Sequence, residues 1–60
     1  MRYAVYFRWS EDNFEDSFNV DSAKERDMNI KEMIERNEFN SIEYCPIYAN
    51  GEYGSHVKAL

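Results

Sequence analysis

The sequence predicts an α+β fold, a small antiparallel sheet with one helix packed on it, in the order β-β-α-β-β. Three observations predict it: apolar and polar residues alternate from Arg2 to Trp9, a helix-capping sequence follows at Ser22, and an Asn-Gly pair at Asn50 ends a later strand pattern. With 60 residues, the chain has the length of one domain, residues 1–60, whose own core leaves little margin of stability.

The first two strands are predicted to form a hairpin. Odd-numbered residues from Tyr3 to Trp9 are all apolar or aromatic, so they form one face of a half-buried strand. The turn formers Ser10–Asn13 follow, and Asn13 can adopt the left-handed conformation that closes a four-residue loop. Pairing Trp9 with Phe14 places these residues opposite each other: Arg2 and Asp21, Tyr3 and Val20, Val5 and Phe18, and Arg8 and Glu15. The two pairs of opposite charge contribute about 0.2–1 kcal/mol each and favour this register.

A helix is predicted from about Asp21 to Asn37. Ser22 precedes Glu25 by three residues, which is the spacing of a capping box, and Asp21 is an alternative cap. Asn37 or Asn40 is expected to end the helix. Apolar residues at helical spacing form the stripe that faces the sheet: Ala23, Ile30, Met33 and Ile34.

A third strand is predicted over Ile42–Ala49, with a turn at Asn50-Gly51 and a fourth strand after it. Pro46 has no amide hydrogen, so the third strand is expected at an edge of the sheet, or bulged at this residue. The core is expected to contain apolar residues of the strands and the helix: Val5, Phe7, Phe18, Val20, Ile30, Ile34 and Ile42.

Composition limits the classes of function. Twelve acidic residues against seven Lys and Arg give a net charge of −5, which argues against general binding to duplex DNA. Cys45 is the only cysteine and His56 the only histidine, so neither an internal disulfide nor a tetrahedral zinc set is expected. The apolar run Tyr3–Phe7 is far shorter than the ~20 residues of a membrane span. No secretory pattern precedes the first strand, and we expect a cytoplasmic location, the host cell cytoplasm if the protein is viral.

Three features could carry binding or chemistry. The basic, aromatic strand Arg2–Trp9 is either a strip for single-stranded nucleic acid or a strand whose arginines pair with acids, and we favour the second. The acidic loop Glu11–Asp16 could hold a hard cation, could mimic phosphate in a partner's basic groove, or could be a solvated loop, which is the simplest interpretation. His56 and Cys45 have no evident catalytic partners, so we predict no catalytic, metal-binding or cofactor-binding residues, no cofactor and no enzyme activity.

Aromatic residues exceed what one helix on a small sheet can enclose. The chain contains five Tyr, four Phe and one Trp, so some rings should be exposed, and contiguous exposed aromatics are typical of protein interfaces. These rings could close a homodimer or contact a foreign protein, and both can hold. The residues predicted to bind a partner are aromatic or acidic: Tyr6, Glu11, Asp12, Phe14, Glu15, Tyr44, Tyr48 and Tyr53.

The segments "YAVYFRW" and "IYANGEYG" flank the predicted helix in an acidic chain. With these segments, and in length and layout, the chain resembles very short proteins that bacterial viruses encode to block host enzymes or immunity, among them the small inhibitors of the Hachiman defence system. That resemblance implies a homodimer without enzymatic activity that binds a bacterial defence protein. The opening "RYAVYFRWSEDNFEDSFNVDSAKE" is also similar to the strand-turn-strand-helix start of HicB-type antitoxins, although the glycine-rich segment that usually follows their second strand is absent. An antitoxin of this type, or a small nucleic-acid-binding module, is the alternative to a viral inhibitor.

Overall fold

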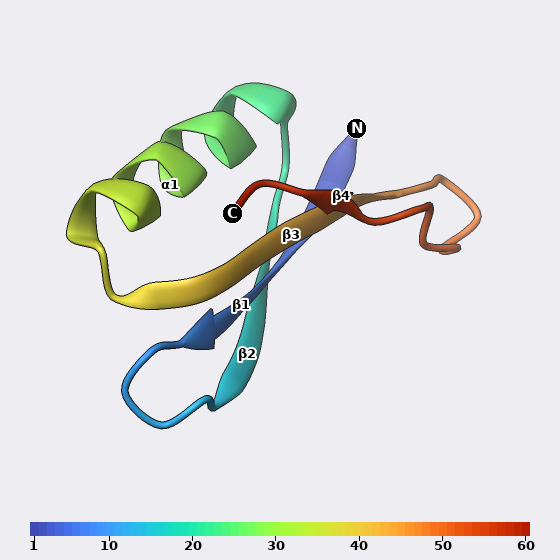
Figure 1. The fold of residues 1–60 in the computed structure, drawn as a ribbon. Helices are drawn as coiled ribbons and strands as arrows, with labels where there is room; N and C mark the ends of the chain where they lie inside the picture. The colour runs from blue at the N-terminus through green and yellow to red at the C-terminus, as the bar shows by residue number, and fades with distance from the viewer.

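Four strands and one helix make up the computed structural model, which describes residues 1–60 (Figure 1). The elements are β1 (Arg2–Trp9), β2 (Glu15–Val20), α1 (Ala23–Arg36), β3 (Phe39–Ile47) and β4 (Val57–Lys58). All neighbouring strands are antiparallel, the spatial order is β2-β1-β3-β4, and α1 lies across one face of the sheet. The α+β class is therefore confirmed. The order β-β-α-β-β holds only roughly, because β4 has two residues.

The β1–β2 hairpin has the predicted register. The Trp9 amide donates to the Phe14 carbonyl at 3.0 Å, and Asn13 adopts the left-handed conformation with a φ of 60°. The predicted pairs within the strands are all present: Tyr3 with Val20, Val5 with Phe18, and Arg8 with Glu15. Beyond the Tyr3–Val20 pair, Arg2 Nε lies 3.5 Å from Asp21 Oδ1. The alternation of side chains and the turn residues were sufficient to fix this part of the fold.

Two capping interactions set the ends of α1. The Ser22 hydroxyl accepts from the Glu25 amide at 3.1 Å, and the Glu25 carboxylate accepts from the Asp21 amide at 2.8 Å. Ser22 is thus the N-cap, and the helix begins at Ala23 rather than at Asp21. At the other end Asn37 has a φ of 54° and donates its amide to the Ile34 carbonyl at 3.1 Å, so Asn37 ends the helix.

The main core lies between α1 and the sheet. It contains Val5, Ile30, Met33, Phe39 and Ile42, all buried, with Phe7 and Phe18 packed against them and partly buried. The expected burial of Ile34 is wrong, because its side chain is 43% exposed. Ile34 lies about 40° around the helix from Ile30, on the side away from Met33, and about 100° from Met33. It therefore falls at the margin of the face that Ile30 and Met33 turn toward the sheet.

β3 starts earlier than predicted and lies inside the sheet. It runs over Phe39–Ile47 instead of Ile42–Ala49, and it pairs with β1 along its whole length. The expected edge position is wrong, since β4 pairs on the other side of β3, and the one register shift between β1 and β3 falls at Arg8/Trp9 rather than at Pro46. Even so, Pro46 is not required to donate a ladder hydrogen bond. The Pro46 carbonyl accepts from the Gly54 amide, so the Pro46 nitrogen also points toward the β4 side, where no ladder is formed at this level.

The turn after β3 confirms the Asn-Gly signal, but the segment after it is mostly not a strand. Gly51 has a φ of 86°, and the Tyr48 amide donates to the Glu52 carbonyl at 2.8 Å. A single bridge joins Ile47 to Tyr53, and regular pairing resumes only at β4. Gly54 passes so close to Pro46 that an added Cβ would lie 2.6 Å from its Cγ. The chain then leads to His56, whose ring stacks on Tyr6 of β1, and to β4 at the edge of the sheet.

Candidate functional site

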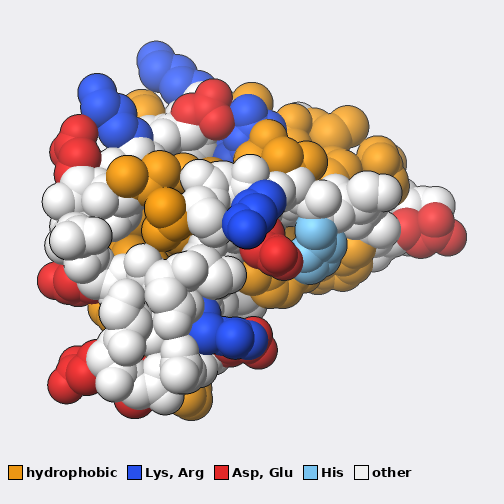
Figure 2. Space-filling view, in the orientation of Figure 1, with side chains coloured by type: hydrophobic (Ala, Val, Ile, Leu, Met, Phe, Trp, Pro, Cys, Tyr) orange, Lys and Arg blue, Asp and Glu red, His pale blue; other side chains and the backbone are white.

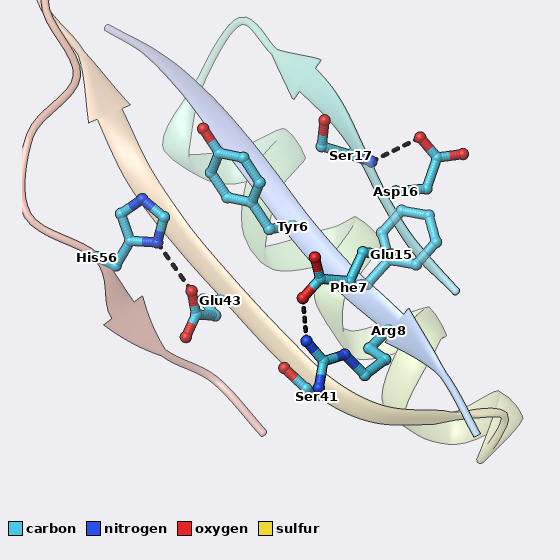
Figure 3. A pocket seen from close by; sticks show the side chains of 9 residues that line it. All are labelled: Tyr6, Phe7, Arg8, Glu15, Asp16, Ser17, Ser41, Glu43 and His56. Atoms are coloured by element: carbon cyan, nitrogen blue, oxygen red, sulfur yellow. Dashed lines mark hydrogen bonds and ion pairs between the residues drawn. The ribbon is translucent and has the colours of Figure 1, made fainter. Parts of the chain in front are cut away.

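The face of the sheet opposite α1 carries a groove that no element covers. Even-numbered residues of β1 point to this face, and the strand registers place Arg8 between Glu15 and Ser41, and Tyr6 between Ser17 and Glu43. The groove has a volume of ≈ 650 Å³ and nine lining residues (Figure 3): Tyr6, Phe7, Arg8, Glu15, Asp16, Ser17, Ser41, Glu43 and His56. We call it the open-face groove.

Two pairs of opposite charge border the open-face groove. The Arg8 guanidinium donates to the Glu15 carboxylate across the β1–β2 ladder. His56 Nδ1 lies 2.8 Å from Glu43 Oε1, which joins the C-terminal segment to β3. The Arg8 Nε is buried and has no hydrogen-bond partner. All four paired side chains remain partly exposed, so each pair contributes little to stability and leaves polar atoms available to a ligand.

Tyr6 forms the aromatic centre of the groove. Its ring stacks on the His56 ring with 4.8 Å between centroids and 18° between planes. Burial raises the pKa of the Tyr6 phenol above its ordinary value of 10.0, and the nearby Cys45 thiol and Tyr53 phenol raise it further. The phenol is therefore neutral at physiological pH and can both donate and accept a hydrogen bond.

One end of the open face, at Ala4 and Cys45, is covered by the chain itself. Ala4 and Cys45 face each other across β1 and β3 on the side opposite the helix, yet they are only 2% and 0% exposed. Because α1 lies on the other face, neighbouring side chains such as Tyr6 and His56 must provide the cover. The single cysteine of the chain is thus a buried packing residue with a free thiol.

The two serine hydroxyls of the groove lie away from the histidine. In Figure 3, Ser41 lies beside Arg8, and Ser17 lies on β2 beyond Tyr6, while the second ring nitrogen of His56 points away from both. A His–Glu pair needs a nucleophile or a bound water within hydrogen-bond reach to act as a general base. No group of three or more His, Cys, Asp or Glu side chains is arranged to hold a metal ion. The surface formed by this groove is suited to recognition through hydrogen bonds, charge and one aromatic ring.

The residues predicted to bind a partner fall in different places. Tyr6 and Glu15 line the open-face groove, whereas Glu11, Asp12 and Phe14 lie in the exposed turn between β1 and β2. Tyr48 and Tyr53 are exposed at the turn after β3, where Figure 2 shows hydrophobic side chains gathered around the histidine and toward the tip of the molecule. The expectation that some rings are exposed is confirmed by Phe14, at 60%, and by these two tyrosines.

Tyr44 lies on the face covered by the helix. Its ring and that of Tyr3 enclose the Arg26 guanidinium, with 4.4 and 4.5 Å from Cζ to the two centroids. Arg26 also donates to Asp27 at 2.9 Å, and this hydrogen bond raises the pKa of the Arg26 guanidinium above its ordinary value. The Tyr44 ring is thus engaged within the chain, where it contributes about 0.5–2 kcal/mol through its contact with the cation.

Sequence reasoning missed most of the groove. It did not select Arg8, Ser17, Ser41, Glu43 or His56, although β1 alternation already placed Arg8 and Tyr6 on one face. The signal that could have found the β3 residues is the alternation of Ser41, Glu43 and Cys45 with Ile42 and Tyr44. It becomes useful only when the register between β1 and β3 is known.

Comparisons with protein-family models, with curated proteins and with solved structures find no match to this chain. The resemblance to viral inhibitors and to HicB-type antitoxins therefore stays a prediction. The homodimer and the protein target implied by it also stay predictions.

The helix α1, with 14 residues, is too short and too polar to cross a membrane.

Proposed function

We propose that this chain is a non-enzymatic binding protein that occupies a basic site on a bacterial protein, as a phage-encoded inhibitor of a defence factor or host enzyme would. The observation that carries this proposal is the open-face groove, whose lining has three carboxylates, those of Glu15, Asp16 and Glu43. Against them stand one arginine, paired with Glu15, and one histidine, paired with Glu43. A cationic side chain or segment is the ligand that such a lining favours. The proposed place of action is the bacterial cytoplasm.

The charge of the surrounding surface supports a basic target. The net charge is −5, and the exposed turn between β1 and β2 adds Glu11 and Asp12 next to the groove end that holds Glu15. Charges of one sign around a binding surface raise the association rate with an oppositely charged partner, and salt weakens that effect. The acids thus steer the encounter, and Tyr6 and the exposed Phe14 supply apolar contact.

Binding of single-stranded nucleic acid is less favoured by the same geometry. The two arginines of β1 both face carboxylates, Arg8 that of Glu15 and Arg2 that of Asp21. A nucleic acid would have to displace these acids before its phosphates could reach the guanidinium groups. The stacking face of Tyr6 toward β4 is also occupied by His56.

The proposal is tested by capture from a bacterial lysate, followed by phage challenge of bacteria that express the chain beside defined defence systems. The informative variant is Glu11→Gln with Asp12→Asn, which removes two charges but keeps the acceptor that Asp12 offers to the Phe14 amide. The matched control is Glu32→Gln with Glu35→Gln, which makes the same charge change on the exposed side of α1.

We expect one stoichiometric protein to be captured by the parent chain, with slower association for the turn variant and an unchanged rate for the helix variant. Neutralisation of one defence system should follow the same order. Capture of nucleic acid without protein at physiological salt would contradict the proposal and support the nucleic-acid alternative. Turnover of a substrate by the purified chain would contradict its non-enzymatic part.

A further inference from the structure

The outer edge of β2 presents backbone groups that no other strand satisfies. β2 is the first strand of the order β2-β1-β3-β4, so only one of its edges is paired. The hydrogen bond from the Trp9 amide to the Phe14 carbonyl fixes which residues point toward β1. In an antiparallel ladder this direction alternates, so Glu15, Ser17 and Asn19 point their backbone N–H and C=O groups outward.

We propose that this edge pairs antiparallel with β2 of a second copy of the chain, with Ser17 opposite Ser17. The pairing joins the two sheets into one and gives the homodimer expected from the sequence a specific interface. It concerns self-association and does not depend on the proposed binding of a bacterial target. The surface involved is the β2 edge, and the open-face groove remains uncovered beside it.

The charge pattern selects this register. Outward-pointing residues must face each other, so the two strands can slip only in steps of two residues. With Ser17 at the centre, Glu15 lies opposite Asn19, whose side-chain amide can donate to the carboxylate, and Asp16 lies opposite Phe18. A slip in one direction places Asp16 opposite Asp16. A slip in the other places Glu15 opposite Asp21, which again brings two carboxylates together.

The same register covers the most exposed aromatic ring. Phe14 is 60% exposed and stands at the start of the β2 ladder, on the side of the sheet that carries Phe18. In the Ser17-centred register it lies opposite Val20 of the second copy, one step from that copy's Phe18. In a two-fold symmetric pair of identical strands, the contact between Phe14 and Val20 forms twice. A strand of unrelated sequence does not in general place an apolar residue opposite Phe14. The second copy is therefore the occupant that the edge fits best.

Asp16 protects the β2 edge while the chain is a monomer. Its carboxylate accepts from the Ser17 amide at 2.8 Å and so satisfies the central outward N–H in the monomer (Figure 3). A charged residue that protects an edge amide is a common defence against unwanted strand pairing. On dimerisation the Ser17 carbonyl of the second copy replaces the carboxylate, and Asp16 is released to solvent.

The test uses the 60-residue chain made by chemical synthesis, with the Ser17 amide nitrogen methylated. Methylation removes only the outward donor and leaves the β1–β2 ladder intact. The matched control carries the methyl group on Glu11, an exposed turn residue whose amide makes no hydrogen bond within the chain. Sedimentation equilibrium across a dilution series gives the mass, and circular dichroism checks that the fold is kept.

We expect the parent and the Glu11-methylated chain to have twice the 7.2 kDa mass at micromolar concentration, and the Ser17-methylated chain to dissociate at least tenfold more readily. Two outcomes would overturn the proposal: a parent chain that stays monomeric throughout, or a dimer whose stability does not change on Ser17 methylation. The second outcome would place the interface elsewhere, for example at Tyr48 and Tyr53. Neither outcome involves a target, so failure here is separate from failure of the proposed function.

Cross-linking tests the register itself. Directly opposed residues of a hydrogen-bonded pair have Cα atoms about 5.5 Å apart, which a disulfide can span. Ser17→Cys should therefore form a disulfide-linked dimer on mild oxidation, whereas Glu15→Cys and Asn19→Cys should each do so at least tenfold more slowly. An equimolar mixture of the last two variants should cross-link readily. Equal rates for all three single variants would contradict the Ser17-centred register.

Discussion

The two faces of the sheet are built by the same strands but held in different ways. On the helix face, Val5 and Ile42 are buried by Ile30 and Met33 of α1. On the open face, the C-terminal segment covers only the end that contains Ala4 and Cys45, and the remainder is a groove with charged and hydroxyl side chains. Stability is thus concentrated on one face, and the proposed recognition lies on the other. Alternation along β1 separates the two, because adjacent residues point to opposite faces.

The largest loss of stability is expected from a charged substitution on the helix face. Val5→Asp places an unpaired carboxylate at a position with 0% exposure, which costs about 3–5 kcal/mol. A core of this size supplies roughly the same amount, so the variant should be unfolded at 25 °C. Circular dichroism and urea denaturation measure this. The control is Glu15→Gln on the open face, which removes an exposed ion pair and should cost less than about 1 kcal/mol. A folded Val5→Asp variant would contradict this assignment of the core.

A smaller loss of stability is expected from a substitution that displaces the C-terminal segment from the covered end of the open face. Gly54→Ala introduces a methyl group 2.6 Å from Pro46 Cγ and 2.7 Å from the Tyr48 hydroxyl, so the segment after β3 must move away. The cost is about 1–3 kcal/mol, and Cys45 should become accessible.

Thiol labelling measures that opening. Cys45 should react at least tenfold faster with a soluble disulfide reagent in the Gly54→Ala variant than in the parent chain. The control is Gly51→Asn, where an added Cβ meets open space and Asn tolerates the φ of 86°. If both variants label as slowly as the parent, the C-terminal segment is not what protects Cys45.

A still smaller loss of stability is expected from removal of the helix cap. Ser22→Ala removes the acceptor of the Glu25 amide and should cost about 1 kcal/mol, which lowers Tm by roughly 4–8 °C in a domain of this size. Differential scanning calorimetry measures the change. Labelling of Cys45 below the transition should stay at the parent rate, because its cover belongs to the open face. A Tm that does not change would show that another group caps α1.

The smallest effect is a titration on the open face. The raised pKa of Tyr6 means that the folded chain holds this proton more tightly than the unfolded chain does. The resulting stability is fully present below pH 10 and is lost as pH rises through the folded-state pKa. In an absorbance titration near 295 nm, Tyr6→Phe should remove a component that ionises above the ordinary tyrosine pKa of 10.0. Loss of an earlier-titrating component would contradict the burial of this phenol.

Local signals predicted the first half of the fold. Alternation in β1, the left-handed Asn13 and the Ser22 cap each act over a few residues, and the structure contains all of them. Ile34 shows the limit of such patterns. Its helical spacing is correct, but the orientation of α1 on the sheet, set by Ile30 and Met33, leaves it exposed.

The candidate site depended on contacts that no local pattern contains. The groove requires the register of β3 against β1, which joins residues more than thirty positions apart, such as Tyr6 and Glu43. It also requires His56 to lie on Tyr6, a contact between residues fifty positions apart. Composition identified the surplus of aromatic rings, but it could not indicate that Tyr44 would be engaged by Arg26.

The separation of stability from recognition is tested by measuring Tm and capture together for Ser41→Lys and Met28→Lys. Both add one positive charge, the first inside the open-face groove and the second on an exposed helix residue. We expect both variants to melt within about 4 °C of the parent chain, because surface substitutions change stability by less than about 0.5 kcal/mol. Ser41→Lys should lose capture of the bacterial protein at least tenfold, and Met28→Lys should keep it. Retained capture by Ser41→Lys, or a parent chain that captures no protein, would contradict the assignment of recognition to this face.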